Sequence, residues 1–436
     1  MPEVRGDGVQ SDGQVVQAAG HDAAAVPAQD RLPGIDILRG LAILGVIIYH
    51  LWAFARFEWE LAPPRAEMLH DSADFFLAGD MISFVTAIVD VFIRSATVWF
   101  IILSGATLTF TAVRRNMKFT PVDFYARRLW RIVRAYWVAL GVVLVSLLLL
   151  AIPKTLIDGG DFLDNSTRVG FISYFDRARI VASIGIFSRG FRSDWVFAAP
   201  NTLWFVVVLL QYYVLFPYLF AAARRLGVAR FLVGAFFISA ASTSLVSWIG
   251  ANDGWMSDSR GFTAFWAPFR LPEFALGMAL GYALAAPDQI RAAISGPFKT
   301  GSIIAVGLFV YYLGALNDDT TTYLQSFSFA LMPLGIACMI LPILIKRPGR
   351  LEWNSLGRFL AWVGPLSFAI LIMNEPFRLL DHYIWTKGAY WTVGWWLYIV
   401  VLYVPGTILL AVPLSKALGF TPPGHRLRLL RPAPSG

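Results

Sequence analysis

The sequence predicts an all-α integral membrane protein, a bundle of about ten transmembrane helices. Hydrophobic residues make up 57% of its 436 residues and charged residues only 15%, and the mean hydropathy is +0.61. Soluble domains carry about 25% charged residues. Apolar stretches of about 17 to 25 residues, long enough to cross a bilayer as helices, recur along most of the chain. The composition therefore excludes an ordinary soluble fold.

The expected spans follow one another with short connections, apart from one long loop. The second span is longer than a bilayer requires, so we expect it to be tilted, broken or preceded by an interfacial helix. The spans are predicted at residues 35–55, 84–112, 128–152, 201–223, 230–250, 262–286, 300–316, 324–345, 359–384 and 392–418.

The chain ends and the long loop differ from the spans in composition. Residues 1–30 are rich in Gly, Ala, Gln and Asp, lack the apolar core of a signal peptide, and predict a disordered tail. Residues 31–420 form the predicted transmembrane domain, in which residues 153–200 are expected to fold as an extracytoplasmic cap. Residues 421–436 form a second predicted tail.

Basic residues indicate the orientation of the chain. They gather in the loops that share a side with both chain ends, for example at Arg114, Arg224 and Arg350, while the short loops on the other side hold few. Basic loops stay in the cytoplasm, so both termini are predicted to be cytoplasmic. The net charge of +8 is explained by this asymmetry, and no nucleic-acid partner is expected.

Histidine and cysteine usage gives no sign of metal binding. The single cysteine, Cys338, lies in an apolar stretch, so neither a disulfide framework nor a cysteine metal site is expected. No metal site is predicted, because none of the histidines has metal-ligand spacing. They are His21, His50, His70, His382 and His425.

The first span carries an arginine and a histidine on one helical face. Arg39 and His50 are eleven residues apart, almost three turns, which places them about 16 Å apart along the axis. Arg39 would lie near a membrane boundary and His50 within the hydrocarbon. Ionisable groups at that depth usually face the bundle interior and serve a function. The alternative is a snorkelling arginine with a histidine satisfied in the core.

Four arginines begin the third span. Arg127, Arg131 and Arg134 fall on one helical face, with Arg128 beside them. The planar guanidinium group suits bidentate contact with phosphate, so this run predicts a site for a phosphate-bearing cosubstrate that enters from the cytoplasm. The alternative is that these arginines only fix the topology of the chain.

Other spans contain polar residues at helical spacing. Opposite charges three or four residues apart inside a span are expected to pair. Leu103-Ser104-Gly105 ends an apolar stretch, where small residues favour close helix packing over catalysis. The charged sets are Asp90 with Arg94, Arg270 with Glu273, and Glu375 with Arg378 and His382 near the outer end of the ninth span.

In order and spacing, these motifs resemble the acyltransferase-3 family of integral membrane acyltransferases over about residues 32 to 418. The matching motifs are Asp36-x-x-Arg39-Gly40…His50, Leu103-Ser104-Gly105, Arg127-Arg128-x-x-Arg131-Ile132, Trp204…Gln211-x-Tyr213…Pro217, Arg270-x-x-Glu273-Phe274…Gly277 and Glu375-Pro376.

The resemblance implies a bacterial inner-membrane enzyme that moves an acyl group from cytoplasmic acyl-CoA to the hydroxyl of an extracytoplasmic sugar or glycolipid. Acetyl-CoA is the expected cosubstrate, and no tightly bound cofactor is expected. The phosphates of CoA are assigned to Arg128 and Arg131, with Arg127 and Arg39 nearby.

His50, with Arg39, is the expected catalytic centre. The imidazole would act as a general base on the acceptor hydroxyl or would carry the acyl group covalently, and either role requires its neutral form. Glu273 and Glu375 are the candidates that would orient it. From the residues alone, the alternative function is a transporter or flippase for an anionic lipid or sugar, in which the same Arg, Glu and His side chains form a substrate path or proton relay.

The chain departs from the family pattern at a few positions. Leu209 and Leu210 stand where many relatives carry paired glutamates, and Asn374 stands where relatives often have histidine. Arg134 occupies the position shortly after the Arg131-Ile132 pair where relatives often have proline. The acceptor side of the site is therefore expected to differ from better-known members. The cap at residues 153–200 is expected to shape acceptor choice. The alternative is that its aromatic residues form a small core of their own or a belt at the membrane interface.

Overall fold

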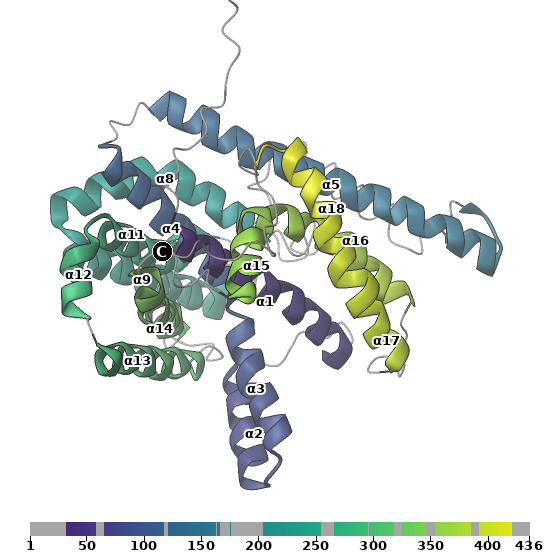
Figure 1. Ribbon diagram of the computed structural model, residues 1–436, viewed down its shortest axis with the longest axis horizontal. Coiled ribbons are helices and arrows are strands. Elements are labelled where there is room, and N and C mark those ends of the chain that lie inside the picture. Colours follow the sequence, from purple (N-terminus) through teal and green to yellow (C-terminus); the bar gives the residue numbers. More distant parts are fainter. Residues whose placement is uncertain are drawn as a thin grey trace, which may run out of the picture. The chain divides into compact units, whose positions relative to one another are not determined.

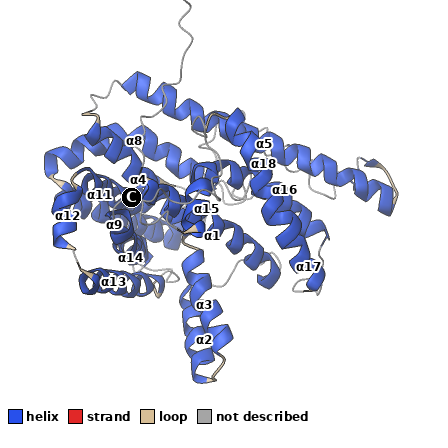
Figure 2. Cartoon of the chain, in the orientation of Figure 1, coloured by secondary structure: helices blue, strands red, loops and turns tan. Residues whose placement is uncertain are grey.

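The computed structural model of the chain is almost entirely helical in its described part (Figure 2). No strand occurs among those residues. The predicted N-terminal tail, the C-terminal tail and most of the cap fall outside the described part. The described residues are 32–57, 65–116, 121–162, 164–165, 175, 204–253, 266–294, 296–317, 325–345, 354–384 and 392–420.

The helices keep one chain order that can be followed in Figure 1. They are α1 (Pro33–Phe57), α2 (Arg65–Leu77), α3 (Met81–Ile93), α4 (Ala96–Arg114), α5 (Pro121–Asp158), α8 (Trp204–Leu226), α9 (Val228–Asp253), α11 (Ala267–Ala285), α12 (Pro287–Ala293), α13 (Pro297–Ala315), α14 (Gln325–Ile345), α15 (Ser355–Val363), the 3₁₀ turn η5 (Gly364–Leu366), α16 (Ser367–Ile384), α17 (Val393–Leu397), the π-helix η6 (Tyr398–Tyr403) and α18 (Val404–Ala417).

Nine segments of the described residues are long and apolar enough to cross a membrane, which confirms the predicted fold class. The one predicted span not among these nine, residues 262–286, corresponds to α11. This helix of 19 residues is about 28 Å long, but Arg270 and Glu273 make it less apolar than the other nine. Most of α11 is buried inside the protein, where these charges meet protein groups and not lipid.

Helices α4 and α11 pack closely through small residues. A Cβ atom at Gly105 would lie 2.6 Å from the carbonyl oxygen of Phe274, which is too close for any side chain. The same holds at Gly277, against the backbone of Ile102. The structure thus supports the packing interpretation of Ser104-Gly105, because glycine there lets two backbones approach each other.

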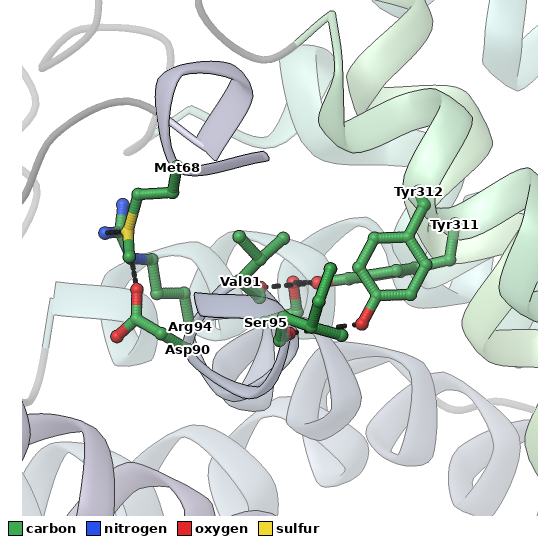
Figure 3. Close-up of polar contacts among 8 residues, drawn as sticks. Met68, Asp90, Val91, Arg94, Ser95, Tyr311 and Tyr312 are labelled. Atoms are coloured by element: carbon green, nitrogen blue, oxygen red, sulfur yellow. Dashed lines mark hydrogen bonds and ion pairs between the residues drawn. The ribbon is translucent and has the colours of Figure 1, made fainter. Parts of the chain in front are cut away.

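The long second span is broken between α3 and α4. The amide of Ser95 donates to Phe92 O at 3.1 Å, and the carbonyl of Val91 accepts instead from the hydroxyl of Tyr311 at 2.6 Å (Figure 3). The Ser95 hydroxyl lies 2.8 Å from the same Tyr311 oxygen, and Tyr312 donates to Ile88 O at 3.1 Å. Helix α13 therefore supplies the hydrogen bonds that the break removes from the helix.

The predicted ion pair lies at the same break. Arg94 Nε donates to Asp90 Oδ2 at 2.9 Å, and both side chains are almost fully buried. The Arg94 guanidinium also contacts the sulfur of Met68 on α2 (Figure 3). The prediction that Asp90 and Arg94 form a structural pair is confirmed.

Helix α1 packs mainly against α4, α15, η5 and α16, with smaller contacts to α3 and α14. Leu38, Ile43 and Ile47 are almost fully buried on this helix. At Gly40 the backbone of Leu360 occupies the space that a Cβ atom would take, so the approach of α15 requires glycine. This packing fixes the position of Arg39 and His50, one near each end of α1.

Candidate functional site

Arg39 is anchored by helix α4. Its Nη2 donates to the hydroxyl oxygen of Thr107 at 3.0 Å, and Thr107 in turn donates to the carbonyl of Leu103 at 2.7 Å. Asp36, one turn earlier on α1, lies 3.9 Å from Arg39 Nη1, the long edge of an ion pair. The Arg39 side chain is still 28% exposed, so its guanidinium remains accessible to a ligand.

Two arginines of α5 cap the C-terminal end of α18. Arg134 donates to the carbonyl of Leu418, and Arg131 Nη2 lies 3.4 Å from the carbonyl of Gly419. The Arg131 guanidinium also lies over the ring of Phe420, 4.7 Å from its centre. Helix C-termini carry unpaired carbonyls and partial negative charge, so cations are stabilising there.

These arginines form one electropositive group, which we name the arginine cluster: Arg39, Arg128, Arg131 and Arg134. The charges of the other three all act on the guanidinium of Arg131. Four like charges that repel one another, with Asp36 as a distant counter-ion, attract anions from solution. Arg127 also belongs to α5, but its side chain lies outside the described part of the chain.

His50 lies toward the other end of α1, where that helix packs against α16. Its Nδ1 atom is enclosed by protein and has no hydrogen-bond partner among the described residues. The charged groups that act on its imidazole are Arg378 and Glu375 of α16. The structure thus leaves one ring nitrogen uncommitted next to a pair of opposite charges.

Glu375 and Arg378 form a buried ion pair one turn apart. Arg378 Nε donates to Glu375 Oε2 at 2.7 Å, and the two side chains are only 8% and 1% exposed. A buried pair of this kind needs good geometry, because both charges have lost their hydration. The predicted alignment of Glu375 with Arg378 is confirmed, while the side chain of His382 lies outside the described part of the chain.

Glu273 occupies a different place. It pairs with Arg270 at 2.7 Å on α11, and its charge acts on Tyr212 of α8. The predicted Arg270–Glu273 pair is therefore present. Of the two carboxylates proposed to orient His50, the charge of Glu375 acts on the imidazole, whereas Glu273 pairs with Arg270 on α11.

Several polar residues beside these sites did not stand out in the sequence. Thr107 lies within an apolar span of the sequence, and only the fold shows that its hydroxyl accepts a hydrogen bond from Arg39. Asp381 could have been found from its spacing, because it lies one turn beyond Arg378 on α16. Asn374 does stand out in the sequence, as a departure from the family pattern, but its surroundings do not. It is fully buried and its Oδ1 atom accepts a hydrogen bond from Tyr403.

The comparisons with known proteins decide the family. A family model described as an acyltransferase domain, that of acyltransferase family 3, matches residues 32–416. The chain belongs to this family. The match runs from the start of α1 into the last turn of α18, so this member of the acyltransferase family is a multi-pass membrane protein. Comparison with curated proteins and with solved structures gives no match.

Proposed function

We propose that this protein transfers an acyl group, acetyl in the first instance, from cytoplasmic acyl-CoA to a hydroxyl of an extracytoplasmic glycan or glycolipid. We place it in the bacterial inner membrane with both termini in the cytoplasm. Membership of the acyltransferase family supports the reaction class. The charged groups at the two ends of α1 support the choice of donor and the roles of the residues.

The arginine cluster is the proposed donor site. Its four guanidinium groups present planar donors suited to the phosphates of CoA, and Thr107 holds one of them in place. The pantetheine arm joins phosphate to sulfur through about twelve bonds, equal to about four residues of extended chain, and so spans about 14 Å. That length is close to the rise of about 16 Å between Arg39 and His50. A thioester anchored at the cluster can therefore reach His50.

His50 is the proposed catalytic residue. In the direct mechanism it removes the proton of the acceptor hydroxyl, whose oxygen attacks the thioester carbonyl. The tetrahedral intermediate then expels CoA as a thiolate, which takes the proton back from the imidazole as the ester forms. In the covalent variant the imidazole attacks the thioester and expels CoA as a thiolate, which takes the ring proton. The acceptor oxygen then attacks the acyl-imidazole, the bond to His50 breaks, and the hydroxyl proton returns to the imidazole. The ion pair of Glu375 and Arg378 would orient the ring in both mechanisms.

One observation carries this proposal: a single helix places Arg39 in a group of partly exposed cations and His50 beside a buried ion pair. A phosphate-bearing donor and a general base have opposite requirements, because the first needs accessible positive charge and the second needs exclusion of water. Helix α1 meets both requirements, because Arg39 and His50 lie about three turns apart on it.

The test is transfer from radiolabelled acetyl-CoA to envelope glycans by the purified protein in lipid nanodiscs. We expect His50→Ala to lower the transfer rate by about 10²- to 10⁴-fold, the usual contribution of a general base. The matched control is His70→Ala, because His70 is exposed on α2 and should be dispensable. Transfer by His50→Ala within a few-fold of wild type would refute the assignment. An acetyl adduct on His50, trapped without acceptor and located by mass spectrometry, would select the covalent variant.

A further inference from the structure

A second group of buried polar residues lies beyond the Glu375–Arg378 pair, between α16 and the segment formed by α17 and η6. Trp395 Nε1 donates to Asp381 Oδ1 at 3.2 Å, and the hydroxyl of Tyr403 donates to Asn374 Oδ1 at 2.9 Å. Tyr398 donates to the carbonyl of Phe377 at 3.0 Å. The charge of Asp381 acts on both tyrosines.

Only one carboxylate oxygen of Asp381, Oδ1, has a described hydrogen-bond partner. The residue is 1% exposed, and its Oδ2 atom has no hydrogen-bond partner among the described residues. The nearby cation, Arg378, is already paired with Glu375. Buried polar atoms are almost always hydrogen-bonded in proteins, because leaving one bare costs about 1 to 3 kcal/mol. The bare oxygen therefore indicates a partner that binds there.

Asn374 has a donor atom without a described hydrogen-bond partner, whereas Asp381 has such an acceptor atom. It is fully buried, its Oδ1 atom accepts from Tyr403, and its Nδ2 donor has no partner among the described residues. Seven residues, about two turns, separate it from Asp381, so both side chains leave the same face of α16 about 10 Å apart. The face thus presents one free acceptor and one free donor. Hydroxyl groups can both donate and accept, so the hydroxyls of one ligand can serve both atoms.

The π-helix brings its two tyrosines to this face. Tyr398 and Tyr403 are five residues apart, a spacing that would point them about 140° apart in an α-helix. The hydrogen bonds of a π-helix span five residues, so both hydroxyls can reach α16. Segments of this kind occur often at functional sites.

We infer that Asp381 and Asn374 bind hydroxyl groups of the acceptor, and that the acceptor is a polyol such as a sugar. This inference rests on the proposed function, since it places the acceptor on α16, the helix that carries Glu375 and Arg378. Asp381 accepts a hydrogen bond from one hydroxyl while a second hydroxyl of the same sugar lies at His50. Trp395 is a positioning residue, because its indole orients the carboxylate.

The experiment compares wild type with Asp381→Asn, in nanodiscs, using acetyl-CoA and methyl β-D-glucoside as the acceptor probe. Asparagine keeps an oxygen for the Trp395 indole and loses the charged acceptor. We expect the KM for the glucoside to rise at least tenfold and the KM for acetyl-CoA to stay unchanged. The matched control is Ser415→Ala, which removes a buried hydroxyl without a described partner at the opposite end of α18 and should change neither value.

Binding of the glucoside is also measured without acetyl-CoA, by saturation-transfer NMR. Binding by wild type and its loss in Asp381→Asn support the inference, even if no transfer occurs, and in that event the proposed reaction alone fails. If wild type transfers acetyl to the glucoside but the KM for the glucoside is unchanged in Asp381→Asn, the inference is overturned and the proposed reaction stands. Equal losses in the two KM values, or no glucoside binding by wild type, also overturn it.

Discussion

The two ends of α1 handle charge in opposite ways. At one end Arg39, Arg128 and Arg131 lie close together with Asp36 as a distant counter-ion, and their other partners are a hydroxyl and helix-end carbonyls. At the other end Glu375 and Arg378 are buried and joined at 2.7 Å. Surplus charge is tolerated where water screens it, whereas buried charge must be paired. The exposed end is therefore suited to capture an anion, and the buried end to hold a neutral base in place.

The largest expected effect comes from breaking the buried pair. Arg378→Met removes the cation that pairs with the buried Glu375 carboxylate at 2.7 Å, so the free energy of unfolding should fall by about 3 to 5 kcal/mol. The measurement is denaturant unfolding of the protein in detergent micelles.

The matched control is Arg131→Met at the exposed end. It relieves repulsion within the arginine cluster and should change the free energy of unfolding by less than about 1 kcal/mol. Similar losses in the two variants would remove the distinction between the two ends.

An intermediate effect is expected from exchanging arginine for lysine in the cluster. Arg131→Lys and Arg128→Lys keep the charge but lose the planar fork, so each should weaken acetyl-CoA binding about tenfold, or 1.4 kcal/mol. Isothermal titration calorimetry gives the dissociation constants. The control is Arg115→Lys, an exposed arginine at the end of α4. Wild-type affinity in both cluster variants would leave these arginines with the topological role alone.

The smallest expected effect concerns the group that holds Arg39. Thr107→Val is nearly isosteric and removes one hydrogen bond, worth about 1 kcal/mol, so the dissociation constant for acetyl-CoA should rise about fivefold. Thr111→Val is the control, because Thr111 lies one turn further on α4 and its hydroxyl donates to the carbonyl of Thr107. If both variants bind acetyl-CoA equally well, Arg39 does not depend on Thr107.

Interactions within one helix were predictable from the sequence. The pairs Asp90–Arg94, Arg270–Glu273 and Glu375–Arg378 each join residues three or four apart, and the structure contains all three. The spans were predictable for a similar reason, since length and apolarity are local properties. The roles of the individual site residues stay predictions.

Interactions between helices were not predictable. Thr107 meets Arg39 across 68 residues, and Tyr403 meets Asn374 across 29. Nothing in the local pattern distinguishes such a threonine or tyrosine from its neighbours in an apolar span. The π-helix was missed because its residues, Tyr398–Tyr403, are apolar or aromatic throughout and therefore show no change of period.

The break between α3 and α4 has a consequence for biosynthesis. Its carbonyl at Val91 and its hydroxyl at Ser95 are completed by Tyr311, which the ribosome adds 216 residues after Ser95. An unpaired carbonyl in lipid costs several kcal/mol. The segment Ser83–Arg114 should therefore enter the bilayer as one continuous helix and bend only when α13 arrives. The shape of the first half of this bundle is thus set by a helix made long after that half has been inserted.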